Sequence, residues 1–111
     1  MAGKLSSDLL RGHTDTIVLS ILLKGDSYGY EIHRTILEKT DEEYELKEAT
    51  LYSSYRRLEQ EGYITAYWGD ESQGGRRKYY RITEKGKELY RQNKRDWEFA
   101  QCILNRLLEE E

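Results

Sequence analysis

The sequence of 111 residues contains no proline and a single cysteine, Cys102. One thiol cannot form a disulfide within the chain and cannot by itself supply a cysteine-rich metal site. The two histidines, His13 and His33, are distant in sequence from each other and from Cys102, whereas zinc sites require clustered Cys and His ligands. We therefore expect no disulfide framework, no metal and no other cofactor.

Long apolar stretches are also missing. The longest, Ile17–Leu23, is interrupted by Ser20 and falls well short of the roughly 20 residues that span a bilayer. It also lacks the small-residue cleavage pattern of a secretory signal. The sequence therefore predicts a cytoplasmic protein without a membrane partner.

The residue types that perform catalysis are sparse and poorly arranged. His13 with Asp15, and Cys102, are the only residues that resemble parts of a catalytic site. A lone histidine near an aspartate is more often a capping or surface residue, and a thiol on an apolar helix is expected to be buried and inert. The sequence shows no glycine-rich phosphate loop and no signature of paired carboxylates. We expect no enzymatic activity.

Basic residues are outnumbered, 18 against 21 acidic residues, but they are unevenly distributed. Residues 76–95 contain nine basic side chains and only two acidic ones, Glu84 and Glu88. The acidic residues concentrate in Glu38–Glu48 and in Glu109–Glu111. A locally basic element on an acidic protein can bind phosphate, although a solvated basic helix face would account equally well for the later part of the run.

Apolar residues at helical spacing predict three helices in the first half of the chain. Glycines and capping residues mark where these helices begin and end, and an acidic loop separates the second from the third. The expected bounds are Asp8–Lys24 (ended by Gly25), Tyr28–Lys39 (capped by Asp26 or Ser27) and Glu48–Glu61 (ended by Gly62), with a loop at Thr40–Glu45 and a very short strand at Tyr44–Leu46.

The pattern then changes to aromatic and β-favouring residues. Tyr63–Trp68 and Arg76–Ile82 are predicted to be strands, joined into a β-hairpin by the polar segment Gly69–Gly75. Thr83 is expected to cap a last helix at Glu84–Glu109, which is unusually long for so short a chain. A helix-turn-helix unit followed by a hairpin is the winged-helix arrangement. We therefore predict a mainly α fold with a small β-hairpin, in which residues 1–83 form a winged-helix DNA-binding domain and residues 84–111 a dimerisation helix.

The outer face of the third predicted helix suits contact with DNA. Leu51, Tyr55 and Leu58 fall on one apolar stripe, and the opposite face is small and polar at its start and cationic further along. Small side chains allow close approach to base edges, and arginine reaches guanine or phosphate. An ordinary amphipathic helix would show the same pattern. The predicted contacts are Ala49, Thr50, Tyr52, Ser53, Arg56 and Arg57.

The hairpin makes DNA binding the stronger interpretation. Its loop places glycines beside three consecutive cations, which would let the backbone approach DNA closely while the cations neutralise phosphates. The competing hypothesis is a protein-interaction module whose basic hairpin binds an acidic partner. The predicted contacts of this wing are Gln73, Gly74, Gly75, Arg76, Arg77 and Lys78.

The last predicted helix has more apolar surface than one short chain can cover. Its seam residues recur at intervals of three and four from Tyr90 onward, as in a coiled coil, and further apolar residues flank the same turns. Such a helix needs more than one neighbour, so a homodimer is predicted. The residues expected to join the two copies are Trp97, Ala100, Ile103, Leu104, Leu107 and Leu108.

Several motifs resemble the PadR family of bacterial transcriptional repressors. Glu48–Tyr52, Arg56–Glu59 and Gly62–Ile64 are similar to the family's recognition-helix signature, Trp68–Arg81 to its wing, and Tyr28–Ile32 to the start of its second helix. The similarity covers nearly the whole chain, and the single C-terminal helix resembles the family's short subgroup. It implies a homodimer, an operator with two-fold symmetry and a C-terminal helix that packs across the partner.

Within the family, the chain resembles a repressor of a multidrug efflux pump. In that protein, the tryptophan that matches Trp97 pairs with its partner's copy and stacks on flat aromatic drugs, whereas spacing alone favours a dimer-core role for Trp97. That relative carries an acid where this sequence has Gln101 and an aromatic residue where it has Lys94, so no preference for cationic drugs is implied. The ligand contacts expected for a planar aromatic molecule are Leu9, Asn93, Trp97, Ala100 and Gln101.

Overall fold

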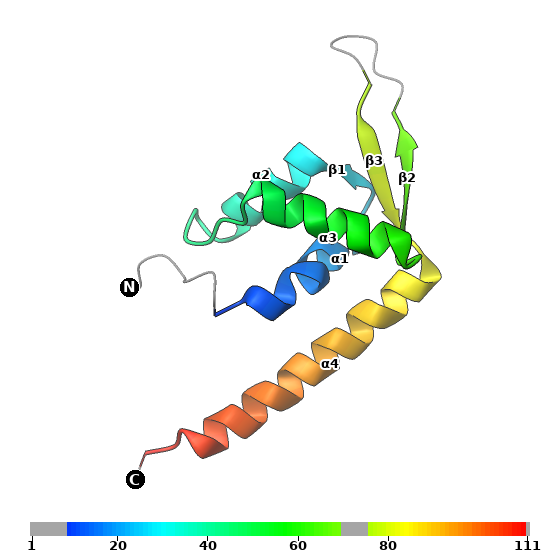
Figure 1. The fold of residues 1–111 in the computed structure, drawn as a ribbon. Coiled ribbons are helices and arrows are strands. Elements are labelled where there is room, and N and C mark those ends of the chain that lie inside the picture. Colours follow the sequence, from blue (N-terminus) through cyan, green and yellow to red (C-terminus); the bar gives the residue numbers. More distant parts are fainter. Residues whose placement is uncertain (1–8, 70–75, 111) are drawn as a thin grey trace.

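The computed structural model describes residues 9–69 and 76–110, and Figure 1 shows the arrangement of its elements. Its order confirms the predicted mainly helical fold with a hairpin and adds one short strand. In the described part of the chain, no helix is both long enough and apolar enough to cross a membrane. The elements are a 3-10 turn (Arg11–His13), α1 (Thr14–Leu23), β1 (Ser27–Tyr28), α2 (Gly29–Lys39), α3 (Glu48–Gln60), β2 (Ile64–Trp68), β3 (Lys78–Ile82) and α4 (Glu84–Leu107).

The strands form one antiparallel sheet in the order β1-β3-β2. β3 lies in the centre, where Tyr80 is opposite Ser27 of β1, and its Lys78 is opposite Trp68 of β2. The sequence did not predict β1, because two residues are too few to show the alternation of a strand. The predicted capping role of Asp26 or Ser27 was also wrong, since α2 begins at Gly29 and has Tyr28 at its N-cap, without a side-chain cap bond.

The short strand predicted at Tyr44–Leu46 does not form. This segment is irregular, and the side chains of Tyr44 and Leu46 are buried in the core. The Thr40 hydroxyl accepts a hydrogen bond from the Tyr44 amide at 3.2 Å and lies 2.9 Å from the Ile36 carbonyl oxygen, so a side chain satisfies an amide that a strand partner would otherwise bond. The alternation that suggested a strand therefore reflects burial of a loop.

The core surrounds α1, which packs against the other helices and the sheet. Val18 and Leu19 of α1 and Ile32 of α2 are completely buried, and Leu51 and Leu58 of α3 nearly so. The predicted apolar stripe of the third helix is confirmed in this way. Partly buried side chains of β3 and α4 complete the same cluster, among them Ile82, Leu89 and Tyr90.

Two glycines determine how the chain leaves α3 and enters α4. Gly62 follows α3 with a φ of 82°, a left-handed conformation that favours glycine, and the Tyr63 amide donates to the Leu58 carbonyl at 2.9 Å. A Cβ at Gly86 would overlap the carbonyl oxygen of Tyr63, so the first turn of α4 packs directly on the chain at the start of β2. The Gly86 amide donates to the Thr83 hydroxyl at 3.0 Å, which confirms the predicted cap.

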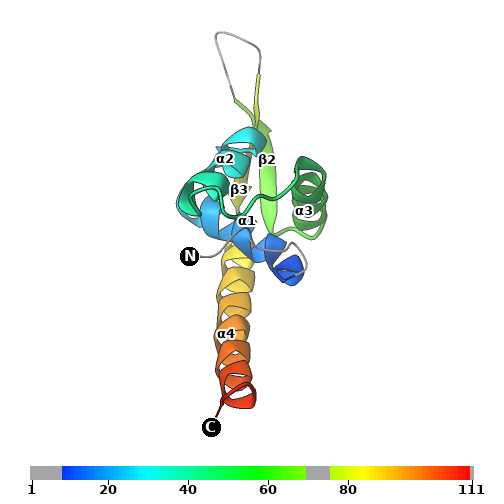
Figure 2. The same cartoon turned by 90° about the vertical axis from the view of Figure 1, so that its left-hand side faces the viewer.

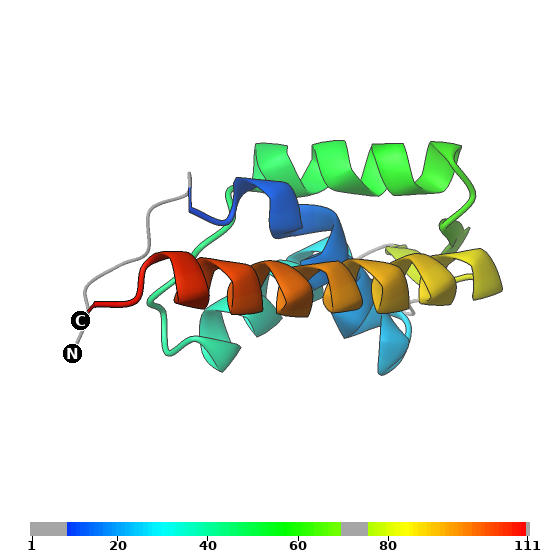
Figure 3. The ribbon, with the colours of Figure 1, turned by 90° about the horizontal axis from the view of Figure 1, so that it is seen from below.

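The wing and the last helix extend in opposite directions from the body. In Figures 1 and 2 the β2–β3 hairpin projects upward, whereas α4 runs downward to a free end. Seen from below in Figure 3, α4 lies across the body, with its last turns extending away from α1. The helix ends at Leu107, two residues before the predicted Glu109.

Candidate nucleic-acid interface

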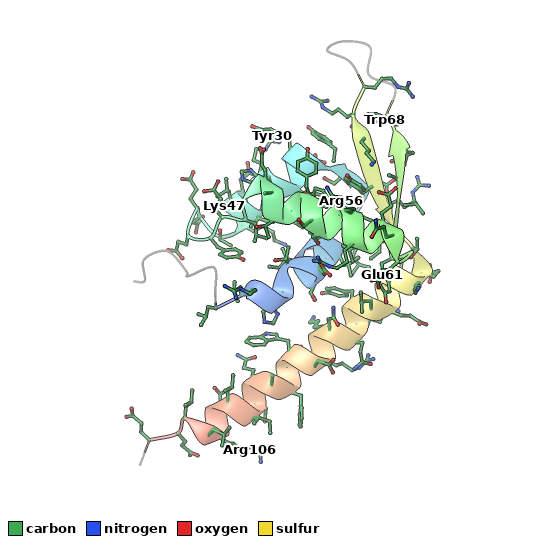
Figure 4. All side chains as sticks on the ribbon, viewed as in Figure 1. Tyr30, Lys47, Arg56, Glu61, Trp68 and Arg106 are labelled. Carbon is green, nitrogen blue, oxygen red and sulfur yellow. The ribbon has the colours of Figure 1, made fainter. Side chains whose placement is uncertain are left out.

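The outer face of α3 is exposed along its length. Leu51, Ser54, Tyr55 and Leu58 are buried, and the remaining positions from Glu48 to Gln60 face solvent. Figure 4 shows Arg56 on this helix, on the side of the body from which the wing rises. The exposed positions include all six residues predicted to contact DNA from this helix: Ala49, Thr50, Tyr52, Ser53, Arg56 and Arg57.

The exposed face of α3 has two flanks. At about 100° per residue, Tyr52 and Glu59 lie on one edge of the face, and Thr50 and Arg57 lie on the other. Glu59 is 3.7 Å from the ammonium of Lys78, so its flank faces the wing. Arg57 bonds to Asp15 in the first turn of α1, so its flank faces the start of that helix. The flanks therefore meet different parts of the molecule.

Asp15 holds the α1 flank of α3 in place. Arg57 donates two hydrogen bonds to its carboxylate, from Nε at 3.0 Å and from Nη2 at 2.6 Å, and the Ser54 hydroxyl donates a third at 2.7 Å. The hydrogen bond to Asp15 raises the pKa of Arg57 above its usual value. The guanidinium that was predicted to reach DNA is thus already paired, and a DNA contact by Arg57 stays a prediction.

The described cations of the wing lie over aromatic rings near the loop end of its strands. The guanidinium of Arg77 lies 4.7 Å from the centre of the Tyr28 ring, and that of Arg76 lies 5.7 Å from Trp68. Lys78 approaches Tyr80 as well as Glu59. These contacts hold the cations close to the hairpin and to β1. The other predicted wing contacts, Gln73, Gly74 and Gly75, lie outside the described residues.

Asp26 braces the opposite side of the wing. Its carboxylate accepts hydrogen bonds from the Tyr67 hydroxyl at 2.6 Å and from Nε of Arg81 at 3.0 Å, which joins both hairpin strands to the turn after α1. Burial alone would raise the pKa of Asp26, but the two hydrogen bonds and the charge of Arg81 together lower it. The direction of the wing is therefore fixed at its base.

The second half of α4 exposes a large apolar surface. Trp97 is 41% exposed, and Leu107 and Leu108 are each 73% exposed. Phe99 and Leu104 are also exposed, while Ile103 is partly buried. The predicted dimerisation residues therefore include four of the large apolar side chains that this region leaves uncovered, Trp97, Leu104, Leu107 and Leu108, but not Phe99. Cys102, expected to be buried, is exposed in the single chain, which corrects that expectation.

A hollow of about 310 Å³ lies between α1 and the middle of α4, beside Trp97. Trp97 lines it and packs edge-on against His13, with ring centres 5.0 Å apart, while Asn93 next to it donates to the Thr16 hydroxyl at 2.9 Å. The other predicted ligand contacts, Leu9, Ala100 and Gln101, are exposed and do not line the hollow. Its remaining lining, which sequence reasoning did not assign to a ligand, is Leu10, Thr16, Ile17, Ser20, Tyr90 and Lys94.

Sequence reasoning also missed the two aspartates that hold α3 and the wing in position. Asp15 was considered only as a partner of His13, and Asp26 only as a helix cap. Their actual partners, Arg57 and Arg81, are 42 and 55 residues away in the chain, and no local pattern connects residues at that distance. Within residues 9–69 and 76–110, the acidic, histidine and cysteine side chains form no cluster that could hold a metal ion.

Comparison with known proteins identifies relatives along most of the chain. Residues 18–92 match the model of the transcriptional regulator PadR-like family. An uncharacterized protein from Lysinibacillus sphaericus is 45% identical over 103 residues, which cover 93% of this chain and 94% of the relative.

Solved structures agree with this match. The structure of a transcriptional regulator from Clostridium thermocellum shares 50% sequence identity with a TM-score of 0.87, covering 95% of this chain and 99% of that one. A PadR family transcription regulator from Clostridium difficile shares 39% identity with a TM-score of 0.77, covering 87% of this chain and 99% of that one.

Proposed function

The chain belongs to the transcriptional regulator PadR-like family, a family of DNA-binding regulators, and from that premise we propose that it is a homodimeric repressor of a two-fold symmetric operator. We further propose that a small planar aromatic ligand releases it from DNA. In this scheme α3 enters the major groove, the wing contacts phosphates, and α4 joins the two copies.

The outer face of α3 beside the cations of the wing is the observation that carries the proposal. Ala49 and Ser53 at its centre are small enough for close approach to base edges, and Arg56 extends from the same face. Arg76 and Arg77 lie next to it at the wing, where they would contact the backbone. A face that combines small polar side chains with flanking cations suits a groove bordered by phosphates.

The apolar second half of α4 supports the dimer. Apolar surface of this extent on a helix end is covered in most stable proteins, and a second copy supplies a matching surface through two-fold symmetry. A two-fold axis at α4 would relate two copies of α3. They would then read half-sites about 34 Å apart or a multiple of that distance, one turn of DNA being about 34 Å.

The hollow beside Trp97 supports the ligand. It combines the indole of Trp97 and the ring of Tyr90 with the apolar side chains of Leu10 and Ile17. Planar aromatic molecules stack favourably on such rings. Because the hollow lies between α1 and α4, a bound molecule would act where the DNA-binding body meets the helix that joins the two copies.

Selection of binding sites from random duplex DNA tests DNA recognition. The protein is expected to enrich an inverted repeat and to bind it with two chains per duplex at protein concentrations where random DNA stays free. Ser53→Ala should change which bases are enriched, whereas Arg76→Ala should weaken binding to all sequences alike. If no sequence is enriched and neither variant affects binding to duplex DNA, the regulator proposal fails and an interaction module for acidic proteins becomes the better account.

Titration with planar aromatic dyes tests the ligand. Trp68 and Trp97 both fluoresce, so the assay compares the parent protein with Trp97→Ala and Trp68→Phe. Quenching in the parent and in Trp68→Phe, together with loss of quenching in Trp97→Ala and release of operator DNA from the parent, is the expected result. Equal quenching in the parent and Trp97→Ala would place the dye elsewhere and contradict the proposal.

A further inference from the structure

The start of α1 lies between α4 and α3, as Figures 1 and 3 show. On one side it meets α4 at the hollow beside Trp97, and on the other it meets α3 at Arg57. We name residues 13–17 the linking turn, and we propose that this turn carries the signal of a bound ligand from the hollow to α3. The assignment rests on the proposed function and adds to it the residues through which a ligand releases DNA.

The side of the linking turn that faces α4 lines the hollow. His13, Thr16 and Ile17 follow the spacing of one helix face, and all three contribute to the lining. Two contacts cross from this face to α4. The amide of Asn93 donates to the Thr16 hydroxyl at 2.9 Å, and the Trp97 ring packs on that of His13 with centres 5.0 Å apart. A molecule that enters the hollow would therefore touch side chains that attach the turn to α4.

Another side of the linking turn holds α3. Asp15 directly precedes Thr16 and points about 100° away from it around the helix. Its carboxylate accepts the hydrogen bonds from Ser54 and Arg57, of which the shortest is 2.6 Å long. Ser54 is completely buried, so Asp15 contacts the packed side of α3 as well as its exposed flank. Adjacent residues of one helical turn therefore hold α4 and α3.

The surroundings of the linking turn leave it room to move. Besides the hollow at α4, a second hollow of about 320 Å³ lies between the turn and α3, and its lining includes Asp15 and Arg57. In the described part of the chain, no side chain caps the start of α1. Within the turn only Thr14 is buried, whereas Val18 and Leu19, which follow it, are completely buried. The start of α1 can therefore shift while the rest of the helix stays fixed in the core.

A ligand would act by breaking the attachment on the α4 side. A planar ring inserted beside Trp97 separates α4 from α1 and removes the bond between Asn93 and Thr16. The turn then shifts, and the carboxylate of Asp15 moves away from Arg57. Because α3 is no longer held in one position, DNA must order it on binding, and affinity for the operator falls. By linkage, operator DNA must weaken ligand binding by the same factor.

The first test needs no ligand. The bond between Asn93 and Thr16 is broken from either side, by Thr16→Val, which keeps the shape of the side chain, and by Asn93→Ala. Solvent exchange of the side-chain Nε proton of Arg57 is then measured by NMR. Both variants should raise its rate at least about threefold, because the pair with Asp15 opens more often. Thr16→Ser keeps the hydroxyl, is the matched control and should exchange as the parent does.

An internal reference accompanies this measurement. The Nε proton of Arg34, which pairs with Glu38 on α2, should exchange alike in the parent and in every variant. Circular dichroism and thermal unfolding confirm that each variant is folded. Equal exchange of the Arg57 proton in the parent and in both bond-breaking variants would overturn the proposal. An equal rise in Thr16→Ser would overturn it as well, because the hydroxyl would then not be the connecting group.

The second test measures the coupling itself. Operator affinity is determined without 2-naphthol, a neutral planar molecule, and at a saturating concentration of it, so that a changed ligand affinity does not enter. The parent should lose affinity by a factor of about 5 to 150, the usual range of allosteric coupling. Thr16→Val and Asp15→Asn should each reduce this factor at least about threefold, because without ligand each already resembles the released state. The double variant should reduce it no further than the stronger single variant, because both changes interrupt one connection.

The outcomes separate this inference from the proposed function. A parent protein that binds no operator, or binds it equally with and without 2-naphthol, overturns the proposed release by a ligand and this inference with it. A parent that 2-naphthol releases, with variants that keep the full factor, overturns the linking turn alone. A factor that is reduced in Thr16→Val but kept in Asp15→Asn would also overturn it, because the connection would then bypass Arg57.

Discussion

α3 leaves one polar and cationic face uncovered, whereas the second half of α4 is exposed at every position except Ile103 and carries large apolar side chains. The face of α3 carries small polar residues and arginine, among them Ser53 and Arg56, whereas that of α4 carries Leu104, Leu107 and Leu108. An uncovered polar, cationic face suits a wet and charged partner such as DNA. An uncovered apolar face suits a second protein surface. The contrast shows that exposure alone does not indicate which kind of partner a helix binds, because the chemistry of the exposed side chains decides it.

The two helices are also attached to the body in different ways, and both attachments start from the first turn of α1. Asp15 holds α3 through Arg57 and Ser54, and its neighbour Thr16 accepts a hydrogen bond from Asn93 of α4. α4 is also held by apolar packing of Leu89 and Tyr90 on the core, by the ammonium of Lys85, which donates to the Glu61 carbonyl at 2.8 Å, and by Trp97 against His13. The first turn of α1 therefore connects α4 to α3, and a displacement of α4 would be transmitted to α3 through it.

The largest effect is expected where a charge is placed on the apolar face of α4. Leu104→Glu would bury an unpaired carboxylate at the dimer contact, and the dimer dissociation constant should rise at least about a hundredfold. Analytical ultracentrifugation measures this change, and operator affinity should fall with it. Asn105→Glu adds the same charge off the seam and is the control. Equal dimerisation by the two variants would show that α4 does not join the copies.

A smaller effect is expected on the polar face of α3. Ser53→Ala should weaken operator binding by about 1 to 2 kcal/mol, the range of one base contact, and leave affinity for random DNA nearly unchanged. The dimer should be unaffected. Fluorescence anisotropy with both duplexes measures the difference. A uniform loss on both duplexes would mean that Ser53 contacts the backbone and that the face does not read bases at this position.

The attachment of α3 to α1 is expected to matter for stability rather than for dimerisation. Asp15→Asn removes the charge that pairs with Arg57 and weakens the bond from buried Ser54, so the free energy of unfolding should fall by about 1 kcal/mol. Urea denaturation measures the loss. Glu38→Gln, at an exposed ion pair with Arg34, is the control and should change stability little. Unchanged stability of Asp15→Asn would mean that the pair does not hold α3.

The smallest effect concerns the wing, and it is present at neutral pH and disappears in acid. The pKa of Asp26 is lower in the folded protein than its usual value of 3.8, so the stability it contributes is complete above about pH 4 and is lost as the pH falls through the lowered pKa. Asp26→Asn should therefore flatten the dependence of unfolding free energy on pH in this range. Urea denaturation at pH values from neutral to acid compares it with the parent. Parallel curves would contradict the role of Asp26 as a brace.

Local patterns predicted most of the fold. The spacing of Leu51, Tyr55 and Leu58 identified the buried side of α3, and Thr83 was recognised as the cap of α4. The failures lie where local pattern and tertiary contact disagree. Tyr44 and Leu46 alternate as in a strand but are buried in a loop. β1 was too short to be predicted from its own residues and is defined only by its pairing with β3.

The candidate interface was predicted in its elements but not in its arrangement. The exposure of the predicted α3 residues follows from helical periodicity, which can be read from the sequence without the structure. Tyr28, Tyr52 and Trp68 come from β1, α3 and β2, and only folding brings them to one concave surface. The role of Trp97 in ligand binding stays a prediction, and its neighbours at the hollow, His13 of the 3-10 turn and Ile17 of α1, were not assigned to it.

By itself, the sequence determined which helices form, which faces are apolar, where the charge lies and which family the motifs resemble, because these properties depend on residues within a few turns of each other. The tertiary structure decided the partners of Asp15 and Asp26, the closing of the wing onto Tyr28, and the direction in which α4 leaves the body at Gly86. These depend on contacts between residues far apart in the chain. Their geometry is set only when α1, α3 and the sheet share one core.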